Sequence, residues 1–566
     1  MNEATKPALD GASILALTEE ACDRLQAARH QKVVHEVLMR ECYWFAAPER
    51  SRSVLSTFKP PTAPPHDGEL LSQSFAFEMC GDLPTVILDT FMPESQKWAG
   101  REPGPMVPVA QRADIKAKAA EGDVQIFKAI SASNFYPECG KTFNPDLAIG
   151  TVAMWIDRKK SGVYHCQGVP IRELEINLGA DGQVDDRFVV RWTKWKHLKK
   201  LIGNKQPYPR AQKKIDDGLR KNKNGDCCFV RGYWRDASEE AGQVVWRYVE
   251  MIDDELIFTN TVKGEGSCKL IVGRLGAGPE WAWATGPMMK ALPDFRTYDE
   301  LSRKKIVSVD MHLMPPSSYP DDSISHLENG IEAGMVYPMR PGSEAAIKNI
   351  YTPPPMDPAI FFLGDLEARI KRGFYLDWPM QSGKTPPTAT QWLDEMTMAQ
   401  RRIGTPGRLF WAEFAAGIFT RFARLLTDDG LIEKVKTSQG QEVSLMPYNP
   451  AQRAADQQDV AQFTRFAQIG GAAFPEEWKV LTDGKGTLTA LADLMGVTRT
   501  WKLRPQDQIQ GALQNIAKLM GGAQPGAPDA GAGEAATQAP LQMGGQPMPQ
   551  PKFDFQSRTY GGGAQG

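Results

Sequence analysis

The sequence has no excess of charge of either sign. Its 566 residues include 66 Lys and Arg against 68 Asp and Glu, which gives a formal net charge of −2. Proteins that hold nucleic acid tightly are usually clearly basic, because their affinity comes from neutralising phosphates. The balance therefore argues against a tight DNA-binding protein. It is compatible with a near-neutral protein that lets DNA slide past.

Cysteine motifs and long hydrophobic runs are also missing. The eight cysteines form no Cys-x-x-Cys pair, and their spacing does not suggest a disulfide framework, so we expect a reducing compartment. The most apolar run, 409–426, is interrupted by Glu413, Arg421 and Arg424, which excludes it as a membrane span. Residues 1–10 are polar and lack the apolar core of a signal peptide. No membrane partner is expected.

No complete catalytic motif is present. Residues 382–385 read Ser-Gly-Lys-Thr and imitate the end of a phosphate-binding loop, but Trp378 stands where that loop needs a glycine. His165 and Cys166 are adjacent, so in a strand their side chains point to opposite faces. We therefore predict no enzymatic activity, no catalytic residues, no cofactor and no metal site. A two-metal nuclease built from scattered carboxylates stays open as an alternative.

The clearest positive feature is a double helix start. Gly286-Pro287 breaks the preceding segment, and Pro293 fixes φ near a helical value where its missing N–H costs nothing. Asp294 is expected to cap the next turn. A loose helical stripe then continues to Met311. This pattern predicts a rod about 27 Å long.

The segments before this rod predict a mixture of helices and strands. Alternation and turn residues favour strands, with a hairpin at Asp181-Gly182, and wider apolar spacing favours helices. The helices are expected at 13–45, 67–91 and 114–131, and the strands at 152–155, 163–190, 228–233, 244–251 and 256–262, with 270–272 as a further antiparallel strand. The fold class is therefore α+β.

One basic and aromatic stretch, 191–200, allows two interpretations. It combines four lysines with Arg191, His197, Trp192 and Trp195. Such interleaving can bind single strands or a phosphate backbone. The favoured alternative is a solvated surface helix whose two tryptophans pack inward.

The segments after the rod predict a small lobe followed by more helices. Residues 315–357 favour a small β-containing lobe, and 361–370 favour a second, shorter rod. A loop covers 371–388, and a capping box at Thr388 opens a long helix that kinks at 404–407. Three more helices are expected at 451–469, 488–495 and 505–520. The tail, 521–566, has too few aliphatic residues to fold.

These positions resemble one known family. The double start at 286–301, the segment 133–151 and the kinked helix start at 388–409 are similar to podophage portal proteins of the T7 type, also called bacteriophage head-to-tail connecting proteins. The resemblance covers roughly residues 20–520. The residues that match its motifs are Asn134, Phe135, Gly150, Gly286, Pro287, Leu292, Pro293, Asp294, Thr388, Thr390 and Arg408.

The resemblance implies an elongated α+β subunit with an α/β wing, a two-helix stem, a small clip and a helical crown. Carried onto this sequence, the parts are the wing (1–285), the first stem helix (286–311), the clip (312–357), the second stem helix (358–370), the channel loop (371–388), a kinked wing helix (389–449), the crown (450–520) and a disordered tail (521–566).

The resemblance also implies a function in the virion. Twelve subunits would form a ring at one capsid vertex, next to the major capsid and scaffolding proteins, after assembly in the host cytoplasm. The ring would pass double-stranded DNA and dock the terminase large subunit, then the tail adaptor and tail tube proteins. Lys371, Arg372 and Lys384 would lie nearest the DNA, or be ordinary exposed loop residues. A tail adaptor, which also forms rings, is the main alternative, and a metal-dependent nuclease is less favoured.

Overall fold

The computed structural model of the chain divides into two compact units, 1–495 and 496–566, and every residue described below lies in the first. The described residues are 10–50, 54–59, 71–94, 96–103, 107, 109–158, 162–236, 244–320, 333–339, 348–349, 357–377, 403–404, 406–434, 444–447, 463–468, 487–488 and 491.

The chain begins with one long helix, α1 (Gly11–Ala46), which confirms the helix predicted at 13–45. Asp10 caps it, because its side chain accepts a hydrogen bond from the Ser13 N–H at 3.1 Å. One face of α1 is buried along most of its length. A second apolar stripe is exposed to solvent, at Val33, Val34, Val37 and Leu38.

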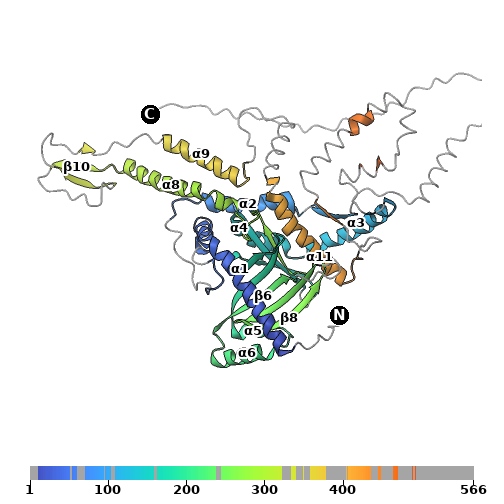
Figure 1. Cartoon of the computed structure of the whole chain (residues 1–566). Helices are drawn as coiled ribbons and strands as arrows, with labels where there is room; N and C mark the ends of the chain where they lie inside the picture. Colours follow the sequence, from blue (N-terminus) through green and yellow to red (C-terminus); the bar gives the residue numbers. More distant parts are fainter. Residues whose placement is uncertain are drawn as a thin grey trace, which may run out of the picture. The chain divides into compact units, whose positions relative to one another are not determined.

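The larger sheet is an antiparallel meander of five strands in the order β4-β5-β6-β7-β8 (Figure 1). Gly182, at a φ of 71°, makes the turn of the predicted first hairpin. Helix α1 covers one face through Leu17, Ala21 and Leu25, and two short helices, α5 and α6, cover part of the other. The bounds are β4 (Leu174–Leu178), β5 (Val184–Lys194), α5 (Trp195–Ile202), α6 (Pro209–Lys221), β6 (Asp226–Arg235), β7 (Val245–Ile252) and β8 (Glu255–Lys263).

The smaller sheet has the order β3-β2-β9 and holds a strand that we expected to pair elsewhere. Strand β9 (Leu270–Arg274) pairs antiparallel with β2 (Thr151–Arg158), not with the strands at 228–262. All five residues of β9 are buried, so it fits beside the buried strand β2 rather than at the half-exposed edge of the larger sheet. The third strand, β3 (Tyr164–Val169), lies at the edge of the smaller sheet.

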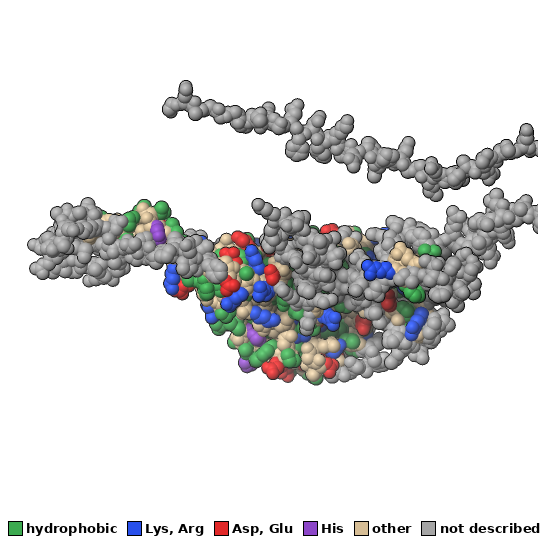
Figure 2. Space-filling view, turned by 90° about the horizontal axis from the view of Figure 1, so that it is seen from above, with side chains coloured by type: hydrophobic (Ala, Val, Ile, Leu, Met, Phe, Trp, Pro, Cys, Tyr) green, Lys and Arg blue, Asp and Glu red, His purple; other side chains and the backbone are tan. Residues whose placement is uncertain are grey.

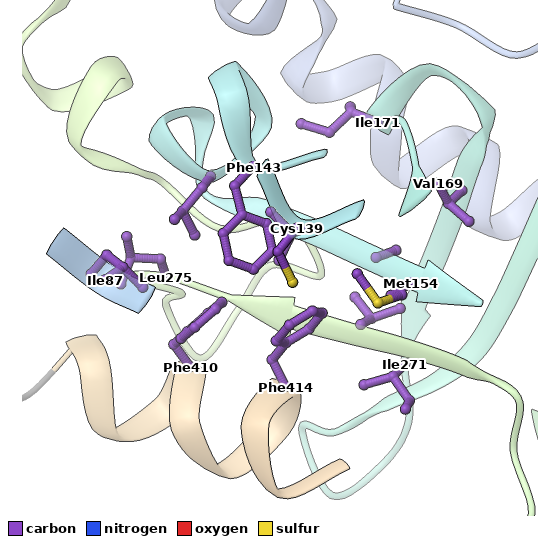
Figure 3. Packing of buried hydrophobic residues seen from close by; sticks show 14 of the residues in the cluster. Ile87, Cys139, Phe143, Met154, Val169, Ile171, Ile271, Leu275, Phe410 and Phe414 are labelled. Carbon is purple, nitrogen blue, oxygen red and sulfur yellow. The ribbon is translucent and has the colours of Figure 1, made fainter. Parts of the chain in front are cut away.

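The main hydrophobic core lies between the smaller sheet and a layer of helices. Helix α4 (Phe135–Ile149) contributes Phe143, whose ring centroid lies 6.1 Å from that of Phe410 and 5.5 Å from that of Phe414 (Figure 3). Gly407 lets the chain pack closely on Phe91, because a Cβ at this position would overlap that ring. The remaining helices near this core are α2 (Phe75–Phe91), α3 (Val109–Ala132), residues 406–410, a π-helical turn (Trp411–Ala415) and α11 (Ala416–Asp428).

Helix α2 starts later than the helical pattern predicted at 67–91. Ser74 is its N-cap residue, and the Gln73 side chain accepts a hydrogen bond from the Ala76 N–H at 3.0 Å. These polar residues fix the start of α2, because the first turn of a helix has backbone N–H groups without partners inside the helix. Residues 60–70 lie outside the described part of the chain. The 191–200 stretch also differs from the predicted helix, because β5 continues to Lys194 and only α5 is helical.

The two predicted rods are helices, and short strands lie between them in the sequence. Helix α7 (Pro287–Lys290) leads into α8 (Leu292–Leu313), and α9 (Asp357–Gly373) lies beside α8 (Figure 1). Between them, three strands form a sheet in the order β11-β10-β12. Their bounds are β10 (Ser317–Pro320), β11 (Val336–Met339) and β12 (Lys348–Asn349).

Elsewhere, β1 (Ala99–Glu102) pairs antiparallel with β13 (Ser444–Pro447), and two 3₁₀ turns occur at Pro48–Arg50 and Ile171–Glu173. Of the helices predicted beyond 450, only 463–468 and a few single positions are described, and the tail at 521–566 lies outside the described residues. Within the described part of the chain, no helix has the length and apolar character needed to cross a membrane.

Candidate functional site at the base of the α8–α9 helix pair

Two glycines from distant motifs meet where the helix pair begins. Gly150, at a φ of 125°, ends α4, and a Cβ on it would lie 2.7 Å from the Gly286 nitrogen. A Cβ on Gly286 would overlap the backbone of Ala148 and Ile149. The Gly286 N–H donates to the Ile149 carbonyl at 2.9 Å. Both positions therefore need glycine for a backbone-to-backbone contact that attaches the start of the helix pair to the body.

Asn134 completes the exposed edge of the smaller sheet. Its Nδ2 donates to the Cys166 carbonyl at 2.8 Å, and its Oδ1 accepts from the Cys166 N–H at 2.9 Å. One side-chain amide thus takes the place of a neighbouring strand on β3. The same Oδ1 lies 3.1 Å from Nδ1 of His165. Asn134 therefore joins the start of α4 to the sheet.

We expect Asn134→Asp to lower the free energy of unfolding by about 1–3 kcal/mol, because a carboxylate keeps the acceptor but leaves the Cys166 carbonyl without its donor. Asn222→Asp is the matched control. Asn222 Oδ1 accepts from the Asn224 N–H at 3.0 Å, and an aspartate retains that bond. Urea denaturation of both variants measures the difference. Equal effects of the two substitutions would contradict the role of the Nδ2 donor.

The base of α8 is held by an aromatic cluster. Phe295 is fully buried, and its ring centroid lies 5.8 Å from that of Phe374 at the end of α9. Phe45 of α1 and Phe75 of α2 contact the same ring at 6.3 and 6.5 Å. Because all these elements contact one ring, the base of the helix pair is fixed to the body.

Polar contacts continue the pairing of α8 with α9. The Tyr298 hydroxyl donates to Glu367 at 2.8 Å, and Asp294 forms an ion pair with Arg369. The expected capping role of Asp294 is wrong. Helix α8 starts earlier, with Ala291 at the N-cap position, so Asp294 lies inside the first turn and its side chain faces α9 instead.

The sequence analysis missed a buried cation in α1. Lys32 is fully buried, and its Nζ donates to the carbonyls of Ile171 and Leu174 at 2.6 and 2.8 Å. Its carboxylate partner is Glu175, at 3.3 Å, and the ring of Trp283 lies 5.3 Å from Nζ. Burial lowers the pKa of Lys32, and Glu175 opposes this shift. The only sequence signal is a lysine on the buried stripe of α1.

A second buried group, Asp146, ties three segments together. It accepts hydrogen bonds from the Tyr43 hydroxyl at 2.7 Å and the Ile171 N–H at 3.1 Å, and it pairs with Arg50 at 3.2 Å. Burial raises the pKa of Asp146, whereas the Arg50 guanidinium acts to lower it. This carboxylate fixes the segment that leads to Gly150, so the motif at 133–151 has a structural role.

The other motif residues lie in several parts of the chain. Pro287 and Leu292 are buried directly after Gly286, and Pro293 stands in the first turn of α8. Phe135 is buried at the start of α4, next to Asn134. Arg408 is exposed on the helical stretch at 406–410. Thr388 and Thr390 lie outside the described residues.

Two of the candidate DNA-channel cations, Lys371 and Arg372, lie in the last turn of α9. The helix continues to Gly373, so the loop predicted from residue 371 begins later. Nζ of Lys371 lies 5.8 Å from the centroid of the Phe75 ring, so this residue also packs against the body. Arg372 is 62% exposed and lies 3.6 Å from Asp377. Lys384 is outside the described residues. In the basic stretch, Trp192 donates to the Ser56 carbonyl at 2.9 Å, so this indole is held by the fold.

The residues at the base of the α8–α9 pair attach these helices to the body and pack against it. All eight cysteines are free thiols. The described ranges hold no group of three or more His, Cys, Asp or Glu side chains that could bind a metal ion. The site anchors a pair of helices through glycines, aromatic rings and buried charges.

Comparison with known proteins identifies the family of this chain. The model of the bacteriophage head to tail connecting protein matches residues 18–501. No curated protein matches the chain. Among solved structures, a chain of the "Neck of empty GTA particle computed with C6 symmetry" is similar at a TM-score of 0.30 and 11% identity, over 74% of this chain and 90% of that chain.

Proposed function

Because the chain belongs to the bacteriophage head-to-tail connecting protein family, we propose that it is the portal subunit of a phage capsid. Twelve copies form a ring at one vertex, and double-stranded DNA passes through the ring during packaging and ejection. The ring docks the terminase large subunit first, and the tail adaptor and tail tube proteins later. Host cytoplasm is the place of assembly, and the capsid and scaffolding proteins are the neighbours.

The observation that carries this proposal is the helix pair itself. Helices α8 and α9 run side by side, and the chain between them holds the small sheet of β10, β11 and β12. In the proposed subunit, α8 and α9 are the two stem helices, and 312–357 is the clip that contacts the packaging motor and the tail. The body of 1–285 is the wing, the chain that follows α9 up to residue 388 is the channel loop, and 450–520 is the crown.

Charge supports a channel that holds DNA weakly. The chain is nearly neutral, and a strongly basic lumen would gain affinity from counterion release at each phosphate and slow translocation. We assign Arg372 and Lys384 to the lumen, with Lys371 at its edge. A ring multiplies each of these charges by the number of subunits, so a few cations suffice to guide the DNA.

Electron microscopy of the purified full-length chain tests the proposal. We expect negatively stained particles to be annuli with an open axial channel, because stem helices form a channel wall only when many copies associate side by side. Mass photometry of the same sample should give a species of about twelve times the subunit mass. A compact monomer at all concentrations, or a solid particle without a channel, would contradict the portal assignment.

A further inference from the structure

A groove follows the contact between α8 and α9 on one side of the pair. It encloses about 530 Å³ and is lined by Ser302, Lys305, Ile306 and Val309 of α8 and by Leu363 and Gly364 of α9. Ile306 is 51% exposed and Val309 is 37% exposed. Large exposed aliphatic side chains in a groove indicate a protein-binding surface.

The opposite side of α8 carries a ridge that matches this groove in length and level. Its members on α8 each stand two positions after a residue that lines the groove, and two residues turn a helix by about 200°. Met314 continues the ridge directly after α8 ends. Val307 is 50% exposed and Met314 is 63% exposed. The ridge consists of Glu300, Lys304, Val307, Met311 and Met314.

We infer that the ridge of one copy occupies the α8–α9 groove of the next copy, an inference that rests on the ring proposed above. The two surfaces differ and lie at the same level on opposite sides of one helix. A rotation can therefore repeat the contact from copy to copy until a ring closes. The occupant is a second copy of this chain because the chain itself presents the complementary surface.

The chemistry of the two surfaces agrees. Val307 meets the apolar floor formed by Ile306 and Leu363. The groove side also carries Lys305 and Asp310, while the ridge carries an exposed Glu300–Lys304 pair at 3.0 Å. Glu367 of α9 also lines the groove, so each surface offers charges of both signs to the other.

Gly364 leaves space for the ridge. A Cβ built on it meets nothing within 4 Å, although glycine weakens a helix. No packing within α9 requires glycine at this position. The ridge of a neighbouring copy would explain the glycine, because that ridge needs the space that a side chain would fill. The same open space makes Gly364 a suitable place for substitution, since a larger residue fills the groove without disturbing the helix.

Oxidative crosslinking tests the contact in the full-length chain. We expect the double variant Val307→Cys, Gly364→Cys to give a ladder of covalent dimers, trimers and larger species on non-reducing gels. Each single variant and the unsubstituted chain should stay at the background level set by the native cysteines. A double variant that stays monomeric, or single variants that crosslink as well as the double variant, would overturn the inference.

A mixing experiment tests the head-to-tail character. Val307→Asp disables the ridge and Gly364→Trp fills the groove, so each variant alone should associate at least about 30-fold more weakly than the unsubstituted chain. Mixed together, they keep one intact ridge and one intact groove, and mass photometry should show dimers and nothing larger. If the unsubstituted chain forms rings and both variants do so equally well, this contact is wrong and the portal function stands. If the unsubstituted chain forms no ring, the proposed function fails with it.

Discussion

Replacing Gly286 by alanine is expected to lower the free energy of unfolding by about 3 kcal/mol or more. The backbone of Gly286 has an ordinary φ of −72°, so alanine meets no conformational penalty there. The cost arises because the new Cβ would overlap the Ala148 carbonyl and the backbone of Ile149. Backbone atoms cannot move aside as a flexible side chain can. The start of the helix pair must therefore separate from the turn after α4.

The matched control is Gly140→Ala, on the helix that leads to this contact. A Cβ on Gly140 meets nothing within 4 Å, and α4 is helical there. Gly140→Ala should therefore raise the free energy of unfolding, by at most about 1 kcal/mol. Chemical denaturation and the yield of soluble protein measure both variants. If Gly286→Ala proved as stable as Gly140→Ala, the close backbone contact would be wrong.

Lys32→Met should have the second large effect, a loss of about 3–5 kcal/mol. Methionine has a similar length, so the packing of α1 on the body is mostly retained. The substitution leaves the buried Glu175 carboxylate without its cation. The Oε2 atom of Glu175 has no hydrogen-bond partner even before the substitution. The carbonyls of Ile171 and Leu174 also lose their donor. An unpaired buried charge is costly because neither water nor a partner stabilises it.

Two further variants separate charge from packing in this effect. Lys269→Met removes a cation from the half-exposed pair with Asp157, at 2.7 Å, and should change the stability by no more than about 1 kcal/mol. Adding Glu175→Gln to Lys32→Met should recover part of the loss, because the unpaired charge is then absent. Thermal unfolding of these variants, of the single Glu175→Gln variant and of the unsubstituted chain gives the comparison. Additive effects of Lys32→Met and Glu175→Gln would contradict a loss that comes from the unpaired Glu175 charge.

The helices and most strands could be predicted because their signals are local. Gly286-Pro287 and Pro293 restrict backbone angles of their own neighbours, so the start of α8 was visible in the sequence within a few residues. The resemblance pointed to Gly150, and its φ of 125° and its contact with Gly286 show why this position needs glycine. The roles assigned by resemblance, from the channel cations to the clip, stay predictions.

The errors concern partners that lie far away in the sequence. Asp294 has the residue type of a helix cap, yet its partner Arg369 becomes available only when α9 lies beside α8. The strand β9 is a short run of buried residues that does not indicate its own partner, and only the buried position beside β2 decides its pairing. Lys32 has an ordinary charged side chain whose acceptors come from 171–175.

The sequence by itself determined where most helices and strands lie, because dihedral preferences and periodicity depend on neighbouring residues. It also determined the near-zero net charge and the resemblance to a head-to-tail connecting protein. Only the tertiary structure decided that Gly150 meets Gly286, that Asn134 closes a sheet edge and that α8 carries unlike surfaces on its two sides. Burial and hydrogen-bond partners arise from segments that are distant along the chain, and no local pattern records which of these segments will meet.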